Sequence, residues 1–112
     1  MIREESYPSL IVNYTLRQKR VNLKYYELYS VSEDVLKVQF SQIVEVQFSD
    51  GQTVKTLPKL SKNGRRLLVP KVTLSESQKE ELTLLKLKPN QHVLSTKNER
   101  YELTRQGYLS ID

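Results

Sequence analysis

Short runs that alternate apolar and polar residues constrain this chain more than any other feature. Residues 35–40 (VLKVQF) and 44–48 (VEVQF) place every second side chain on one side of an extended backbone. That period is typical of a half-buried β-strand. Asp50-Gly51 follows the second run and predicts a hairpin with a type I′ turn, which needs positive φ at both central residues.

β-forming residues also dominate six other segments: 9–15, 21–30, 66–70, 92–96, 100–105 and 108–111. One helix is predicted after Ser75, because Ser75 and Gln78 have the spacing of a capping box and acidic residues follow in the first turns. We therefore predict a mainly β fold with one short α-helix, arranged as a small β-barrel or meander.

The charge balance changes sign near Pro58. Residues 27–50 contain five acids and one lysine, whereas the stretch between Asp50 and Glu76 contains six cations and no acid. We predict an N-terminal β unit of unassigned role at residues 1–58. A basic hairpin, the helix and a closing meander make up residues 59–112, and one compact domain is the alternative.

Two clusters of cations indicate an anionic partner, most often a nucleic acid. The chain has a net charge of +5 and a pI of about 9.5. The alternative is a solvated face on a basic protein. As nucleic-acid-binding residues we predict two groups: Lys62, Asn63, Arg65, Arg66 and Lys71 around the Asn63-Gly64 turn, and Arg17, Lys19 and Arg20 between the first two strands.

Enzymatic motifs are sparse. The absence of cysteine excludes disulfides, thiolate nucleophiles and zinc–sulfur sites. His92 is the one histidine, and we expect a structural or exposed role for it. No phosphate-binding loop, nucleophile elbow or dinucleotide fingerprint is present. We expect no enzymatic activity, no metal and no cofactor.

The tyrosines Tyr25, Tyr26 and Tyr29 follow the first cationic cluster. We interpret them as core residues, with a stacking platform for single-stranded nucleic acid as the alternative. The N-terminal apolar run covers three residues, and no segment approaches the roughly 20 apolar residues of a membrane span. We expect a cytoplasmic protein without a membrane partner.

The stretch from about residue 59 to residue 106 carries four short motifs in order. They are Asn63-Gly64, Val69-Pro70-Lys71, residues 85–93 (LKLKPNQHV) and residues 99–103 (ERYEL). This order resembles the AbrB/MazE-like (SpoVT-AbrB) swapped-hairpin domain of bacterial transition-state regulators and antitoxins. Asn90-Gln91 stands where the family has Gly-Asp, and the helical region is longer by about two turns.

The resemblance implies an intertwined homodimer in which each chain completes the small barrel of the other, here through the C-terminal half. It also implies that Lys62, Arg65, Arg66 and Lys71 contact double-stranded DNA. Our first hypothesis is a non-enzymatic DNA-binding homodimer, a transcriptional regulator or antitoxin. The alternative is a small β-barrel adaptor that binds another protein or belongs to a larger assembly, and a binder of single-stranded nucleic acid is a third hypothesis.

Overall fold

The computed structural model describes residues 10–89 and 91–111. Within these residues the chain forms one helix and nine strands: β1 (Leu10–Gln18), β2 (Val21–Ser32), β3 (Val35–Gln47), β4 (Thr53–Lys55), β5 (Lys59–Leu60), β6 (Arg66–Val69), α1 (Glu76–Thr83), β7 (Gln91–His92), β8 (Glu99–Thr104) and β9 (Gly107–Ser110). The predicted mainly β fold with one short helix is confirmed.

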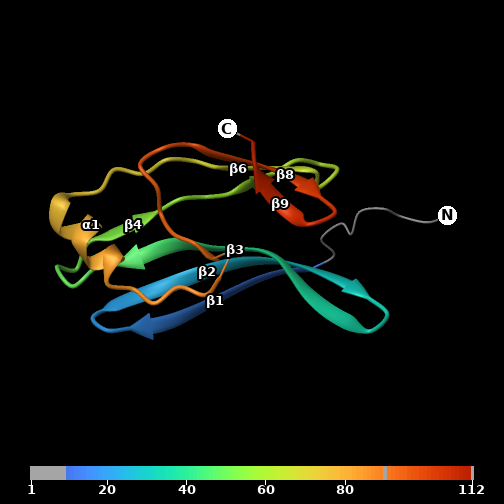
Figure 1. Ribbon diagram of the computed structural model, residues 1–112. Helices are drawn as coiled ribbons and strands as arrows, with labels where there is room; N and C mark the ends of the chain where they lie inside the picture. The colour runs from blue at the N-terminus through green and yellow to red at the C-terminus, as the bar shows by residue number, and fades with distance from the viewer. Residues whose placement is uncertain (1–9, 90, 112) are drawn as a thin grey trace.

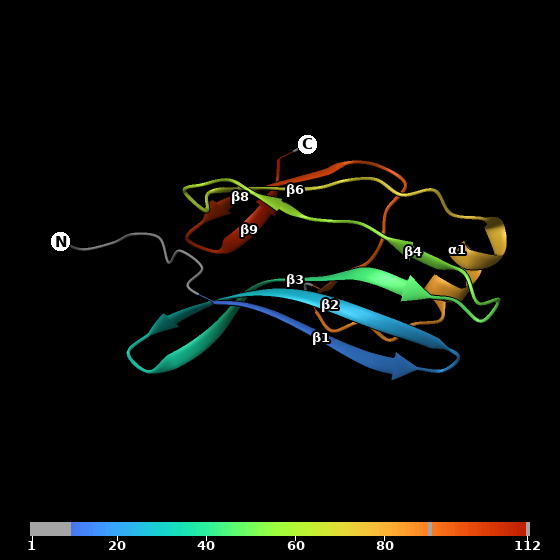
Figure 2. The ribbon, with the colours of Figure 1, turned by 180° about the vertical axis from the view of Figure 1, so that it is seen from behind.

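The strands form two sheets that lie one above the other, with α1 at one end (Figures 1 and 2). Sheet A has the antiparallel order β1-β2-β3-β4, and β7 pairs in parallel with β3. Sheet B has the antiparallel order β5-β6-β8-β9. The sheets do not close into a barrel within the described residues, so the meander is the arrangement that the structure has.

The chain passes from sheet A to sheet B near Pro58, where the charge balance changes sign. The two sheets nevertheless share apolar contacts, because Leu28 and Phe40 of sheet A pack with Leu67 and Tyr101 of sheet B. That residues 1–58 and 59–112 form separate units stays a prediction.

Strand β2 contributes to two hydrophobic cores on its opposite faces. Val21, Leu23 and Tyr25 belong to the first core, which also contains Leu82 of α1. Leu28 belongs to the second core, under sheet B. Because successive side chains of a strand point to opposite faces, residues 23 and 28 lie on different sides of sheet A. One twelve-residue strand therefore anchors the helix along one part of its length and sheet B along another.

The two alternating runs at 35–40 and 44–48 join into the single long strand β3. Pairing with β2 skips Gln39 and Val44, so each is a bulge in the register. The hairpin to β4 is confirmed, but its predicted turn type is wrong. Gly51 has φ +87°, and Asp50 does not have positive φ, whereas a type I′ turn needs it at both positions.

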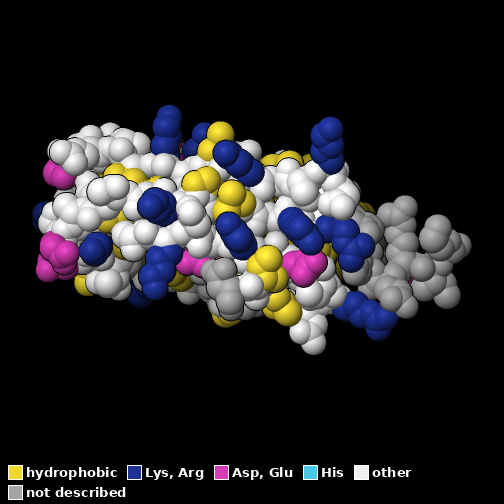
Figure 3. All heavy atoms as spheres, turned by 90° about the horizontal axis from the view of Figure 1, so that it is seen from above, with side chains coloured by type: hydrophobic (Ala, Val, Ile, Leu, Met, Phe, Trp, Pro, Cys, Tyr) yellow, Lys and Arg dark blue, Asp and Glu magenta, His cyan; other side chains and the backbone are white. Residues whose placement is uncertain are grey.

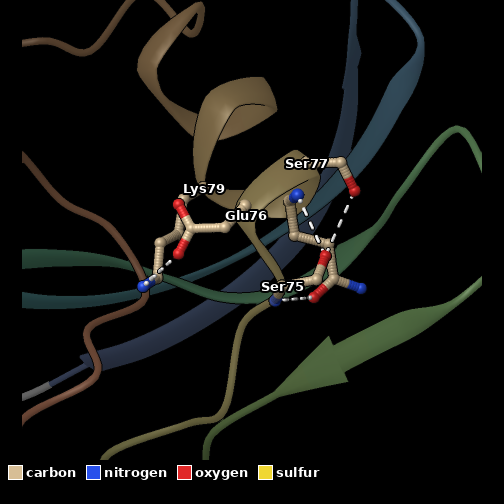
Figure 4. Close-up of polar contacts among 5 residues, drawn as sticks. Ser75, Glu76, Ser77 and Lys79 are labelled. Carbon is tan, nitrogen blue, oxygen red and sulfur yellow. Dashed lines mark hydrogen bonds and ion pairs between the residues drawn. The ribbon is translucent and has the colours of Figure 1, made fainter.

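The predicted capping box at the start of α1 is confirmed. The backbone N–H of Gln78 donates to Ser75 Oγ over 3.2 Å, and the backbone N–H of Ser75 donates to Gln78 Oε1 over 2.9 Å. Figure 4 shows Ser75 beneath the first turn, with Ser77 beside it and an ion pair between Lys79 and Glu76. The two capping-box hydrogen bonds satisfy backbone N–H groups at the start of the helix that have no partner within it.

Candidate nucleic-acid interface

The turn between β5 and β6 is held rigidly by its own side chains. Asn63 Oδ1 accepts hydrogen bonds from Ser61 Oγ at 2.8 Å and from the Arg65 backbone N–H at 3.0 Å. Gly64 has φ +72°, and its carbonyl accepts a hydrogen bond from the Tyr108 hydroxyl. The side-chain oxygen of Asn63, one of the predicted contact residues, is thus committed to the fold, and the turn presents its cations from a fixed backbone.

The register of sheet B places cations on its outer face. Lys59, Leu68 and Arg100 face one another across three strands. Arg66 and Glu102 form the neighbouring pair on the same face. The intervening residues, such as Leu67 and Tyr101, are buried beneath the sheet. Alternation along β6 and β8 therefore separates an apolar inner face from a charged outer one.

The loops beside sheet B add further cations, and the whole set is called the basic face below. It comprises eight residues: Lys59, Lys62, Arg65, Arg66, Lys71, Lys97, Arg100 and Arg105. The acids in the same segments are Glu99 and Glu102, both half-buried. Figure 3 views this side of the molecule and shows Lys and Arg side chains distributed across it, with few acidic ones between them. The excess of positive charge in the chain is thus concentrated on sheet B.

A hollow of about 410 Å³ lies within the basic face. Lys59, Arg66 and Arg100 contribute to its lining, together with the apolar side chains of Leu68 and Ile111. Cations around an apolar floor suit an anionic group that carries a flat or aliphatic portion.

The structure brings together some of the predicted contact residues. Lys62, Asn63 and Arg66 are exposed at the β5–β6 turn, and Arg65 there is half-buried. Lys71 is exposed just beyond the other end of β6. Sequence reasoning missed Lys59, Lys97, Arg100 and Arg105. The alternation of Arg100 and Glu102 with buried Tyr101 and Leu103 is the signal that would have placed Arg100 on the outer face.

The second predicted group lies at the opposite end of the molecule. Arg17, Lys19 and Arg20 belong to the β1–β2 hairpin of sheet A, which Figures 1 and 2 show far from the β5–β6 turn. Lys19 and Arg20 line a 490 Å³ cavity with Glu80 and Glu81 of α1. Two acids thus line the same cavity as two of the three cations predicted in this hairpin, and the hairpin does not join the basic face.

The tyrosines that follow this hairpin do not form one surface. Tyr25 is 5% exposed and stacks on Tyr14, with ring centroids 4.8 Å apart. Tyr26 packs against the second core. The Tyr29 hydroxyl donates to Glu27 Oε1 at 2.6 Å. The arrangement supports their interpretation as core residues.

His92 is half-buried and stacks on Phe40, with ring centroids 5.1 Å apart. Its Nδ1 lies 3.4 Å from the Tyr101 hydroxyl. Burial lowers the pKa of His92 and favours the neutral ring. These contacts give His92 a packing role between sheet B and strand β3.

A buried carboxylate at Glu27 escaped sequence reasoning. Glu27 is 5% exposed and accepts hydrogen bonds from Tyr29 and, at 2.7 Å, from Ser41. Burial alone raises the pKa of Glu27, but these bonds and one from Tyr14 outweigh it and lower the pKa overall. The hydrogen bond to Glu27 in turn raises the pKa of Tyr29 to about 12. No local signal marks this cluster, because its members come from three strands.

Comparisons of the chain with protein-family models, curated proteins and solved structures find no match. The resemblance to the AbrB/MazE-like domain therefore rests on the motifs alone and stays a prediction. Asn90, within its second motif, lies outside the described residues. In the described part of the chain, α1 is the one helix, and it is too short and too polar to cross a bilayer.

Proposed function

We propose that this protein is a non-enzymatic DNA-binding protein that contacts double-stranded DNA through the basic face. The observation that carries the proposal is the one-sided charge: eight cations and two half-buried acids lie on sheet B and its loops. Such an excess of positive charge on one side of a protein favours a polyanionic partner. DNA phosphates are such a partner, and their neutralisation releases condensed counterions.

The individual cations of the basic face suit different kinds of contact with DNA. Arg66 and Arg100 are exposed on neighbouring strands, where planar guanidinium groups can bind phosphate or a guanine edge with two hydrogen bonds. Lys59, Lys62 and Lys71 supply point charges around them. The rigid β5–β6 turn fixes the register of these groups, and this pre-organisation reduces the entropy lost on binding.

The resemblance of residues 59–106 to the AbrB/MazE-like domain supports a role as a transcriptional regulator or antitoxin. It also supports a cytoplasmic homodimer. These finer statements depend on the resemblance, whereas the proposal of DNA contact also stands on the charge distribution.

Fluorescence anisotropy with duplex DNA, single-stranded DNA and RNA tests the proposal. We expect duplex binding that weakens by about 10³-fold or more between roughly 50 and 200 mM salt, because six or more phosphates would be neutralised. Preference for single-stranded DNA or RNA would contradict the duplex assignment. Absence of binding at the lower salt concentration would overturn the proposal as a whole.

A protein adaptor remains the second candidate, and the hollow in the basic face is the observation that favours it. Ile111 lines the hollow and is 49% exposed, and Leu109, at 45%, lies on the same sheet. An acidic partner segment with one apolar anchor would match this mixture. Such a partner would bind with a weaker salt dependence than DNA and would not be displaced by duplex competitor.

A further inference from the structure

The hairpin formed by the end of β2 and the start of β3 extends past the end of sheet B (Figures 1 and 2). Its tip is the two-residue turn Glu33-Asp34, with φ of +50° and +64°. Val31 pairs with Leu36 and Tyr29 pairs with Val38, so these four side chains share one face. Leu10 pairs with Tyr29 and extends this face onto β1.

This face is apolar and uncovered within the described residues. Leu10, Val31, Leu36 and Val38 are 44%, 57%, 55% and 48% exposed. The helix and the first core contact sheet A elsewhere, through residues such as Leu23 and Val46. A contiguous group of exposed apolar side chains indicates a contact surface more strongly than the same residues scattered singly.

The edge of β3 that does not pair with β2 is open beside this apolar face. On that edge, β7 pairs at Ser41 and Gln42, and β4 pairs from Glu45 to Gln47. The start of β9 approaches Gln39, because a Cβ built on Gly107 would lie 3.5 Å from the Gln39 carbonyl oxygen. From Val35 to Val38 no described strand pairs with this edge, so its backbone groups are available to another strand.

We propose that a second copy of this chain pairs with this edge, antiparallel to it, to give a homodimer through the β2–β3 hairpin. An antiparallel pairing of two identical edges has the two-fold symmetry of a closed dimer. Centred on Val35, it also brings Leu36 of each copy diagonally beside Leu36 of the other, within reach across the two strands.

The charges of the β2–β3 hairpin favour a second copy of this chain as the partner of this edge. The hairpin carries Glu33 and Asp34 at its tip and Lys37 three residues further along. Antiparallel pairing centred on Val35 places Lys37 of one copy opposite Glu33 of the other and next to its Asp34, twice per dimer. Two basic chains would meet here at an acidic tip, whereas contact between their basic faces would be repulsive.

The proposal goes beyond DNA binding and stands without it. It also uses sheet A, whereas the resemblance to the swapped-hairpin family implies a dimer through the C-terminal half. A contact this short belongs to the small end of protein interfaces, so we expect a dissociation constant of about 10–100 μM.

Sedimentation equilibrium with charge-reversed variants tests the pairing. We expect Lys37→Glu to be monomeric, and the double variant Glu33→Lys/Asp34→Lys to be monomeric as well, because each places like charges across the dyad. An equimolar mixture of the two should dimerise, since every contact in the mixed dimer again joins opposite charges. Lys19 already adopts φ +54° in this chain, so lysine is compatible with the tip conformation.

Lys55→Glu on β4 is the matched control, because it makes the same charge change at an exposed residue away from the hairpin. It should dimerise as the unmodified chain does. A chain that is monomeric at several hundred micromolar, or reversed variants that dimerise alone as well as the unmodified chain does, would overturn the proposal. A mixture that stays monomeric would overturn the assigned pairing.

Discussion

Sheet A and sheet B carry similar numbers of strands but differ in where their charges lie. In the described residues, sheet A places one buried carboxylate, Glu27, among three hydroxyl donors, and Lys19 and Arg20 of its β1–β2 hairpin line a cavity with acids of α1. The fully buried side chains on the inner face of sheet B are aliphatic or tyrosine, and its exposed cations lie on the outer face and in the loops. A count of charges along a sequence does not define a binding surface, because the neighbours of each charge decide whether it is available to a partner.

The difference between the two sheets predicts that substitutions affecting the stability of the fold and substitutions affecting DNA affinity fall in different places. Substitutions in the core of sheet A should lower the free energy of unfolding and leave the DNA affinity of the folded molecules unchanged. Substitutions on the basic face should do the reverse.

Leu23→Ala should have the largest effect on stability. Leu23 is fully buried in the first core, and its truncation leaves a cavity beside α1. We expect a loss of about 3 kcal/mol in the free energy of unfolding, measured by urea denaturation. Leu57→Ala is the control, since Leu57 is 76% exposed and should change stability by less than about 0.5 kcal/mol. Equal losses in both variants would contradict the placement of the core.

Glu27→Gln should cost about 2 kcal/mol at neutral pH, because it replaces charge-assisted hydrogen bonds in a buried site. The pKa of Glu27 is lower in the folded chain than in the unfolded one, so its contribution is present above the unfolded value of about 4.3. The contribution disappears as the pH falls through the folded pKa. The difference in unfolding free energy between the two proteins should therefore shrink on acidification, and a constant difference from pH 7 to pH 3 would argue against an ionised Glu27.

Ser75→Ala should have a smaller effect, about 1 kcal/mol, because it removes one hydrogen bond of the capping box. Thermal denaturation followed by circular dichroism measures this loss. Thr73→Ala, an exposed position two residues earlier, should be nearly neutral. Since α1 lies at the far end from the β5–β6 turn, neither variant should alter DNA affinity.

The parts of the fold that the sequence predicted correctly are those set by local rules. Strand alternation, the hairpin at Asp50-Gly51 and the capping box of Ser75 each depend on residues within a few positions of one another. The turn type failed because Asp50 and Gly51 follow a different backbone path that the dipeptide alone does not specify.

The remaining features depend on contacts between distant segments. The union of two predicted strands into β3 needs the bulges at Gln39 and Val44, which arise only in pairing with β2. The two-sided burial of β2 depends on α1 and sheet B, which begin 27 or more residues after the end of β2. The separation of Arg17 and Arg20 from Arg66 follows from the order of the sheets, which the pattern of charges along the sequence does not predict.

The salt dependence of DNA binding in two matched double variants tests the central claim most directly. Arg66→Gln/Arg100→Gln and Arg17→Gln/Arg20→Gln remove the same charge, the first pair from the basic face and the second from the β1–β2 hairpin. We predict that the slope of log affinity against log salt decreases in magnitude by about 2 for the first variant and remains unchanged for the second. Equal changes in the two variants, or an unchanged slope in the first, would contradict the assignment of the basic face.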